Sequence, residues 1–385
     1  MTEEHPASQV SRRQFLLTAG LPAVAVASCA PQTGAPSPAT PSAQAPGRAK
    51  WEEDWDALVT AARQEGKVVV LTLSGPGWRK GLDAFADSFG IAVEQAGNTA
   101  PTIWVPKIQR ERLAGIYAYD VATVLSQSAL TLLRPDGVWD NLRALLFRPD
   151  VLDDAAWYGG FESRFMDLDR QLAFGWEYSI SRNLYVNTDL VSAGEIKTPQ
   201  DLLNPKWKGK IILADVRLGG TFNPMASLRS RYGDGFVKQL LVDQEPGFGR
   251  DVRMITEQLI RGRYAIALYM QLGVLDDFRS QGVGGNVRVV NLPEIAYVRS
   301  NAVLGFNRAP HPNAAKLFIN WLLTKGGQMA FCKGLGTNSA RRDVEAFDAE
   351  GKPEPGQQSF ELREQNFAKI ENTQKFLQDL VGIKD

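Results

Sequence analysis

Short runs of aliphatic residues alternate with helical patterns near the start of the folded part of this chain. Lys67–Thr72, with the sequence KVVVLT, is apolar almost throughout and predicts a buried strand. Further strands are expected at 91–94 and 120–125, with helices at 78–89 and 105–116 between them. An order of strand, helix and strand makes consecutive strands parallel and covers the sheet with helices. The sequence therefore predicts an α/β fold.

The same alternation continues through the second half of the chain. Thr198 and Pro199 suit the N-cap and the first position of a helix. Further strands are expected at 174–188, 210–214, 264–268, 287–290 and 302–306, and further helices from Thr221, at 250–261, at 312–323 and at 358–381. The body that begins at Trp51 is longer than a typical single domain, so we expect two lobes.

The segment 1–29 has the pattern of an export signal. Arg12 and Arg13 precede an apolar run at 15–27, which is shorter than the ~20 residues of a membrane-spanning helix. This start resembles a twin-arginine signal, and the sequence VASC that ends at Cys29 is similar to the lipobox of bacterial lipoproteins. The resemblance implies that Cys29 carries a lipid, and that the protein is exported and held in the cell envelope, periplasmic or on the outer face of the cytoplasmic membrane.

Residues 30–50 are rich in Pro, Ala and Ser and contain almost no large apolar side chain. Such a segment cannot bury enough apolar surface to offset the entropy of ordering, so we expect a disordered linker. A lipid on Cys29 followed by this linker would hold a soluble body near a membrane surface.

Charge and the small number of Cys and His residues argue against several functions. The 43 basic and 43 acidic residues balance, which argues against nucleic acid as a partner. With Cys29 lipidated, Cys332 has no second cysteine for a disulfide. His5 lies in the signal, and His311, between two prolines, is expected to be a solvated loop residue. We therefore expect no metal site, no Ser-His-acid triad and no cofactor.

Several segments, taken in order, resemble the extracellular solute-binding proteins of ABC importers (family 1, ferric-iron-type branch). These segments cover most of the body. They are WDALVTAARQEGKVVVLT, YSISRNLYVNTDL, TPQDLLNPKWKGKIILADVRLGGTF, GRYAIALYMQ and APHPNAAKLFINWLLTKGGQ.

The resemblance implies the type II periplasmic-binding-protein fold, in which two α/β lobes are joined by crossing strands and hold the ligand in the cleft between them. We expect residues 51–172 with 303–385 to form the first lobe and residues 173–302 the second. The resemblance also implies a monomer that captures a small molecule, passes it to an ABC permease in the membrane and catalyses no reaction.

Ligands of such folds lie beyond the carboxyl ends of parallel strands and at helix N-termini. The residues expected to bind the ligand follow predicted strands in both lobes or lie on the extended stretch 174–188. They are Ser74, Gly75, Trp78, Arg79, Ser126, Tyr178, Arg217, Gly220, Thr221 and Tyr269. Glycine lets the backbone approach a ligand, and each arginine can form two parallel hydrogen bonds with a carboxylate or phosphate.

Each of these residues also has a structural interpretation. Trp78 can be a core residue or a lid, and Arg79 can belong to a surface ion pair. Tyr178 can pack on a sheet face, as tyrosines in strands usually do. The glycines before Thr221 can simply form a turn.

Two departures from the iron-binding branch bear on the ligand. Iron-binding members carry an adjacent tyrosine pair shortly after the strand expected at 264–268, and this chain contains no Tyr-Tyr dipeptide. Some members also have a histidine in the first lobe, where Ser74-Gly75-Pro76 stands here. The sequence therefore favours an organic anion, such as a carboxylate or a sugar phosphate, with ferric iron as the alternative.

Two other classes of function remain open. One is an exported NAD(P)-type oxidoreductase, because the glycines from Gly75 to Gly81 follow a strand and approach a dinucleotide-binding motif. The last glycine lies one residue late for that motif, and no catalytic acid, base or metal cluster accompanies it. The other class is a surface sensor lipoprotein, which would use the same two-lobed body to signal to a receptor.

Overall fold

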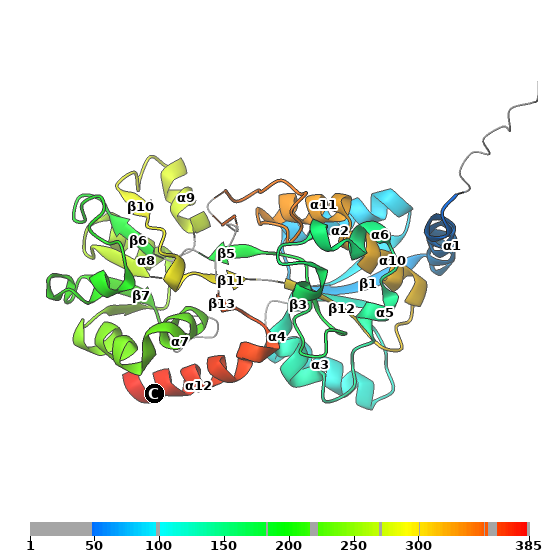
Figure 1. The fold of residues 1–385 in the computed structure, drawn as a ribbon, viewed down its shortest axis with the longest axis horizontal. Coiled ribbons are helices and arrows are strands. Elements are labelled where there is room, and N and C mark those ends of the chain that lie inside the picture. The colour runs from blue at the N-terminus through cyan, green and yellow to red at the C-terminus, as the bar shows by residue number, and fades with distance from the viewer. Residues whose placement is uncertain are drawn as a thin grey trace, which may run out of the picture. The chain divides into compact units, whose positions relative to one another are not determined.

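The computed structural model describes residues 48–97, 101–181, 184–215, 222–268, 272–299, 301–349, 351–352 and 360–382. The predicted signal, Cys29 and most of the predicted linker lie outside these residues. Within them, helices and strands alternate as the sequence predicts (Figure 1). None of the helices in the described ranges has the length and apolar character needed to cross a membrane.

The first sheet has the strand order β2-β1-β3-β12-β4. Its strands are β1 (Lys67–Thr72), β2 (Ala92–Gly97), β3 (Val121–Leu125), β4 (Phe174–Gly175) and β12 (Asn301–Gly305). β1 pairs in parallel with both β2 and β3, whereas β12 runs antiparallel to β3 and β4. The strand predicted at Lys67–Thr72 is confirmed with its bounds.

Helices cover both faces of this sheet, because β1 is apolar on both sides. Val68 and Val70 share a core with α1 (Lys50–Glu65), α2 (Pro76–Phe89), α10 (Pro312–Leu322) and α11 (Lys325–Leu335). Val69 and Leu71 instead face α3 (Pro101–Leu113). The predicted helices at 78–89, 105–116 and 312–323 are thus confirmed within a few residues of their expected bounds.

α2 and α11 pack closely because two glycines meet where they cross. A Cβ atom on Gly77 would lie 2.5 Å from the carbonyl oxygen of Gly334, and one on Gly334 would lie 2.6 Å from the carbonyl oxygen of Gly77. Pro76 begins α2, where its missing N–H is not needed. The start of α2 therefore packs against α11 through backbone contacts that only glycine permits.

The second sheet has the strand order β10-β6-β9-β7-β8. Its strands are β6 (Leu184–Asn187), β7 (Ile211–Ala214), β8 (Gly247–Gly249), β9 (Ile266–Leu268) and β10 (Val287–Val289). Three longer helices accompany it: α7 (Phe222–Lys238), α8 (Val252–Ile260) and α9 (Leu272–Ser280). β7 is parallel to β8 and β9, so this half of the chain repeats the α/β construction of the first.

A third, small sheet joins the other two. It consists of β5 (Ser179–Ser181), β11 (Tyr297–Arg299) and β13 (Phe360–Glu361) in the order β13-β11-β5, and Figure 1 shows it between the two larger sheets. The single strand predicted at 174–188 is wrong in this respect, because this stretch contains β4, β5 and β6 in three different sheets. The chain leaves the first sheet, crosses and enters the second within these residues.

The remaining helices are short, except the last. They are α4 (Ser126–Ser128), α5 (Leu142–Leu145), α6 (Pro149–Leu152), η1 (Ala129–Leu133), η2 (Asp154–Ala156), η3 (Phe161–Arg164), η4 (Pro199–Leu203), η5 (Pro205–Trp207), η6 (Gln239–Asp243) and η7 (Pro293–Ile295). The final helix, α12 (Glu364–Val381), begins later than the predicted residue 358. It lies mainly along α7 of the second lobe, although the sequence assigned residues 303–385 to the first lobe.

Candidate functional site

The topology brings the carboxyl ends of both sets of parallel strands to the crossing. In the first sheet, Leu125 at the end of β3 pairs with Asn301, which directly follows the crossing strand β11. In the second sheet, Leu268 at the end of β9 pairs with Leu184, the first residue of β6 after the crossing strand β5. In α/β folds, ligands bind beyond the carboxyl ends of the strands. The candidate site therefore lies where the two lobes are joined.

Ser74 and Gly75 follow β1 at the first of these edges, and both are exposed. Gly75 is the N-cap of α2 with a φ of 138°, a conformation that favours glycine, and no side chain caps the helix. Backbone N–H groups at such a helix start attract anions. This loop can therefore approach an anion through its backbone.

Trp78 is only 6% exposed and belongs to the core of the first lobe. Its ring centroid lies 6.0 Å from that of Trp176 and 6.2 Å from that of Phe331, both in edge-to-face geometry. These contacts agree with the core interpretation of Trp78.

The Arg79 guanidinium bonds to one residue of its own helix and to one of β2. Its Nε donates to Oδ1 of Asp83 over 2.7 Å, and its Nη1 donates to the carbonyl of Val93 in β2 over 3.3 Å. The side chain is 44% exposed, so this is a surface ion pair of the kind that contributes little to stability.

Ser126 is buried at the end of β3. Its hydroxyl donates over 2.9 Å to the carbonyl oxygen of Leu362, which lies 236 positions later in the chain. The C-terminal segment therefore already uses the hydrogen bond that the sequence assigned to a ligand.

Tyr178 lies on the segment that leads into β5 and is 9% exposed. Its ring stacks on Tyr158 at 5.8 Å, and the guanidinium of Arg164 lies 4.7 Å from its centroid. Burial raises the pKa of the Tyr178 phenol to about 12, with a further contribution from the nearby Glu361 carboxylate. The contacts of Tyr178 are those of a residue packed against the first lobe.

The predicted residues of the second lobe, Arg217, Gly220, Thr221 and Tyr269, lie outside the described residues. Residues on either side of positions 216–221 are described. Asp215 directly follows β7 and is 2% exposed, its backbone N–H donates to Gly249, and its Oδ2 lies 3.5 Å from Nε of Arg250. This places a buried carboxylate at the carboxyl end of β7.

Asn223 is the second residue of α7, in its first turn. It is 8% exposed, and its Oδ1 has no hydrogen-bond partner among the described residues. A buried amide without a partner is costly, so such groups commonly have an external partner. The sequence analysis missed Asn223, although an Asn just inside a helix that follows a glycine-rich loop is a recognisable signal.

A buried polar cluster on the crossing segments was also missed. The Glu177 carboxylate accepts hydrogen bonds from the side chains of Asn301 and Thr337. Ser179 bonds to the Thr337 hydroxyl and accepts from the backbone N–H of Asn338 over 3.0 Å. The cluster fixes both crossing segments to the first lobe. The alternation of polar and apolar residues at 176–181 was the available signal.

His311 differs from the solvated residue that the sequence predicts. Its Nδ1 lies 2.9 Å from Oδ2 of Asp120, and its backbone N–H donates to Oδ1 over 2.8 Å. Burial raises the pKa of the Asp120 carboxyl group. The pair fixes the loop before α10 to the start of β3. In the described part of the chain, no group of three or more His, Cys, Asp or Glu side chains is placed to hold a metal.

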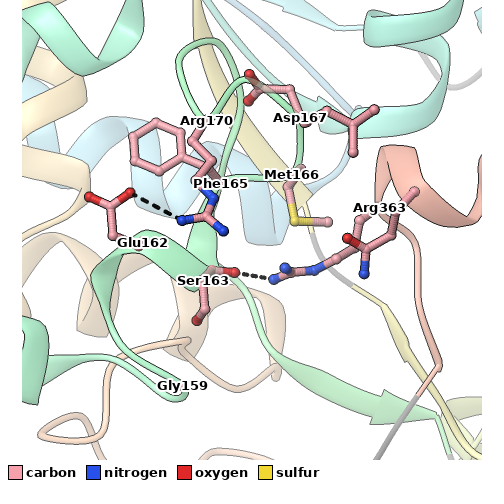
Figure 2. A pocket seen from close by; sticks show the side chains of 10 residues that line it. Gly159, Glu162, Ser163, Phe165, Met166, Asp167, Arg170 and Arg363 are labelled. Carbon is pink, nitrogen blue, oxygen red and sulfur yellow. Dashed lines mark hydrogen bonds and ion pairs between the residues drawn. The ribbon is translucent and has the colours of Figure 1, made fainter.

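A pocket of about 380 Å³ lies apart from the predicted residues (Figure 2). It is lined by residues of the 159–170 loop and by Arg363 and Gln365. Figure 2 shows Glu162 paired with Arg170 and Arg363 bonded to the carbonyl of Ser163. Of its charged side chains, Glu162 and Arg170 thus pair with each other, whereas Arg363 bonds to a backbone carbonyl.

Known structures share this arrangement of lobes. Iron-bound HitA from Pseudomonas aeruginosa superposes with a TM-score of 0.62 at 15% identity, covering 82% of this chain and 99% of that one. A Trichodesmium protein (IdiA, FutA) in complex with iron and citrate gives a TM-score of 0.65 at 16% identity, covering 83% and 100%. An ABC transporter protein from Clostridium perfringens gives 0.64 at 13% identity, covering 82% and 100%.

The sequence alone finds no such relatives, since no family model and no curated protein matches it. The structural likeness shows the fold, which is the two-lobed α/β fold of periplasmic binding proteins. The fold class predicted from the sequence is confirmed.

Proposed function

We propose that this chain is the substrate-binding lipoprotein of an ABC importer and captures a small solute between its lobes. The observation that carries the proposal is topological: the carboxyl ends of β3 and β9, in two separate sheets, meet at the same crossing. A ligand at that position touches both lobes. It can therefore favour a closed form by binding it more tightly than the open form.

An organic anion is the ligand class that the described residues favour. The uncapped start of α2 at Gly75 offers backbone N–H groups, and the Asn223 amide oxygen at the start of α7 has no partner among the described residues. Arg217 would add a guanidinium that binds a carboxylate through two hydrogen bonds. The anionic group of a carboxylate or a sugar phosphate accepts from these donors, whereas Oδ1 of Asn223 is an acceptor and needs a donor on the ligand, such as the hydroxyl of a hydroxy acid or a sugar. The chain performs no catalysis on the ligand.

Ferric iron is the second candidate. It is favoured by the fold likeness to iron-bound HitA and to the Trichodesmium protein in complex with iron and citrate. The absence of adjacent tyrosines in the sequence argues against it, because phenolate is a strong ligand for ferric iron.

A thermal-shift series on the full chain separates these candidates. The panel contains citrate and other carboxylates, sugar phosphates, ferric citrate and a ferric salt. A ligand at about 100 times its dissociation constant stabilises the native state by about 2.7 kcal/mol, which is a measurable shift. A shift with an organic anion alone supports the proposal. A shift only when ferric ion is present supports the second candidate, and no shift with any compound contradicts both.

We further propose that the mature chain begins at Cys29, which carries a lipid and retains the body at the cell envelope. The Cys29→Ser variant tests this in a bacterial host that processes lipoproteins. The wild-type chain is expected in the membrane fraction and the variant in the soluble fraction. A variant that remains with the membrane contradicts the lipid anchor.

A further inference from the structure

The C-terminal segment 360–381 touches both lobes. Its first part, β13, pairs in parallel with the crossing strand β11, with Tyr297 opposite Phe360 and Val298 opposite Glu361. Its second part, α12, runs along α7 and reaches α4 (Figure 1). The lobes are therefore joined by three chain segments, of which β5 and β11 are two.

Polar contacts attach the start of this segment to the first lobe. Ser126 donates to the carbonyl of Leu362, and Arg363 donates to the carbonyl of Ser163. Glu364 adds two contacts: its Oε1 lies 2.6 Å from Nη1 of Arg134, and its Oε2 accepts the backbone N–H of Leu168 over 2.7 Å. The Glu364 and Arg134 side chains are only 22% and 29% exposed, so water screens this pair incompletely. The backbone N–H of Glu364 also donates to Met166 over 3.0 Å.

The rest of α12 is attached to the second lobe along its length. Ile370 and Leu377 are almost fully buried. Arg229 of α7 lies 4.3 Å from the ring centroid of Phe376, and its Nη1 donates to Oγ1 of Thr373 over 3.4 Å. This attachment combines buried apolar side chains with a cation–π contact, and it is distributed over several turns.

We propose that segment 360–381 is a strap between the lobes, and that Glu364 is its releasable end. The inference rests on the proposed function, in which the lobes move about the crossing strands. Because α12 is fixed along α7, it moves with the second lobe. The contacts that such a movement must change are therefore those between the start of the segment and the first lobe, of which Glu364 makes two, with Arg134 and Leu168. While these contacts are intact, they restrain the movement of the lobes. When they break, the lobes can separate or rotate.

The test measures the distance between the lobes in the absence of any ligand. Spin labels are attached to Asp87→Cys on α2 and Asp277→Cys on α9, two exposed positions, in the full chain carrying Cys29→Ser. The remaining cysteine, Cys332, is buried and not expected to react. Pulsed electron paramagnetic resonance then gives the distance distribution. If segment 360–381 acts as a strap, we expect Glu364→Gln to shift or broaden this distribution and Arg134→Gln to do so in the same direction.

Glu371→Gln is the matched control, because Glu371 lies on the exposed side of the same helix. It is expected to leave the distribution unchanged. An unchanged distribution in folded Glu364→Gln, or an equal change in Glu371→Gln, overturns the strap. Because no ligand is used, this result does not depend on whether the thermal-shift series finds one.

Hydrogen exchange on the same variants gives a second readout. In Glu364→Gln, amides of the first turn of α12 are expected to exchange about tenfold faster, while those near Ile370 and Leu377 stay protected. Equal loss of protection along the whole helix contradicts a strap with one releasable end. Circular dichroism of each variant confirms that it is folded before either measurement is interpreted.

Discussion

The two edges that meet at the crossing differ in how their side chains are used. At the first-lobe edge, Trp78 packs in the core, Arg79 pairs with Asp83, and Ser126 donates to Leu362. At the second-lobe edge, the amide oxygen of Asn223 is buried and has no partner within the described ranges. A buried polar group without an internal partner is costly unless something outside the chain satisfies it.

We infer from this difference that the first-lobe edge supports the ligand and that the second-lobe edge recognises it. The first-lobe edge offers mainly backbone N–H groups at Gly75, beside side chains that mostly already have partners. The Thr72 hydroxyl, at the end of β1, is also buried without a partner among the described residues. The second-lobe edge would then supply the side chains that select the ligand, with Asn223 and Arg217 as the leading candidates. We therefore expect ligand recognition to depend on the second lobe more than on the first.

The largest effect is expected from Trp78→Ala, as a loss of stability. Removing a buried aromatic side chain typically lowers the free energy of unfolding by about 3–5 kcal/mol, and Trp78 is 6% exposed. Denaturant unfolding without ligand measures the loss. Leu113→Ala, at a residue that is 88% exposed, is the control and should change little. A stable Trp78→Ala chain that binds ligand poorly would identify Trp78 as a lid instead.

A smaller effect is expected from Tyr178 at high pH. Burial raises the pKa of its phenol to about 12 in the folded state, above the ordinary value of 10.0. Below pH 10 both states are protonated and the stability is present in full. As the pH rises from about 10 to about 12, the unfolded state ionises first, and stability falls by about 1.4 kcal/mol per pH unit.

The Tyr178→Phe variant lacks the ionisable phenol and should lose less stability than the wild-type chain between about pH 10 and pH 12. Denaturant unfolding at several pH values measures the difference. Parallel losses in the two chains would contradict the burial of Tyr178. Ligand affinity should be equal in both chains at neutral pH if Tyr178 only packs against the first lobe.

The smallest effects on stability are expected from substitutions of two buried asparagines, Asn187 and Asn223, and the two losses should differ. Nδ2 of Asn187 donates to the carbonyl of Leu259 over 2.8 Å, and its Oδ1 accepts from Asp189 over 2.9 Å. Asn187→Ala should therefore lower the free energy of unfolding by about 1–3 kcal/mol. Asn223→Ala removes an unpartnered amide oxygen and should cost much less without ligand, while reducing the ligand-induced thermal shift. Equal losses of stability in the two variants would contradict the role assigned to Asn223.

Local patterns in the sequence predicted much of the fold. The buried strand at Lys67–Thr72 and the helix that follows it depend on residue order within a few turns, and both were predicted closely. The stretch 174–188 was not predicted closely, because its residues join three different sheets. The sheet that each part joins depends on partners far away in the sequence; for example, the backbone N–H of Trp176 donates to the carbonyl of Asn301. Strand periodicity does not show which sheet a strand joins.

The candidate site was harder to predict for the same reason. Following each strand to its end led to the edges of the two sheets that lie at the crossing. It could not show that Ser126 is bonded to Leu362, which is 236 positions away. It also could not show that the Arg79 guanidinium pairs with Asp83 and the Val93 carbonyl.

The most direct test compares one arginine from each edge. Isothermal titration measures the dissociation constant of the anion that stabilises the wild-type chain, for wild type, Arg217→Ala and Arg79→Ala. Loss of a charge-assisted pair of hydrogen bonds predicts binding about tenfold or more weaker in Arg217→Ala, whereas loss of a surface ion pair predicts a change within about twofold in Arg79→Ala. The reverse order, with affinity lost in Arg79→Ala and kept in Arg217→Ala, would place recognition on the first lobe and contradict the account.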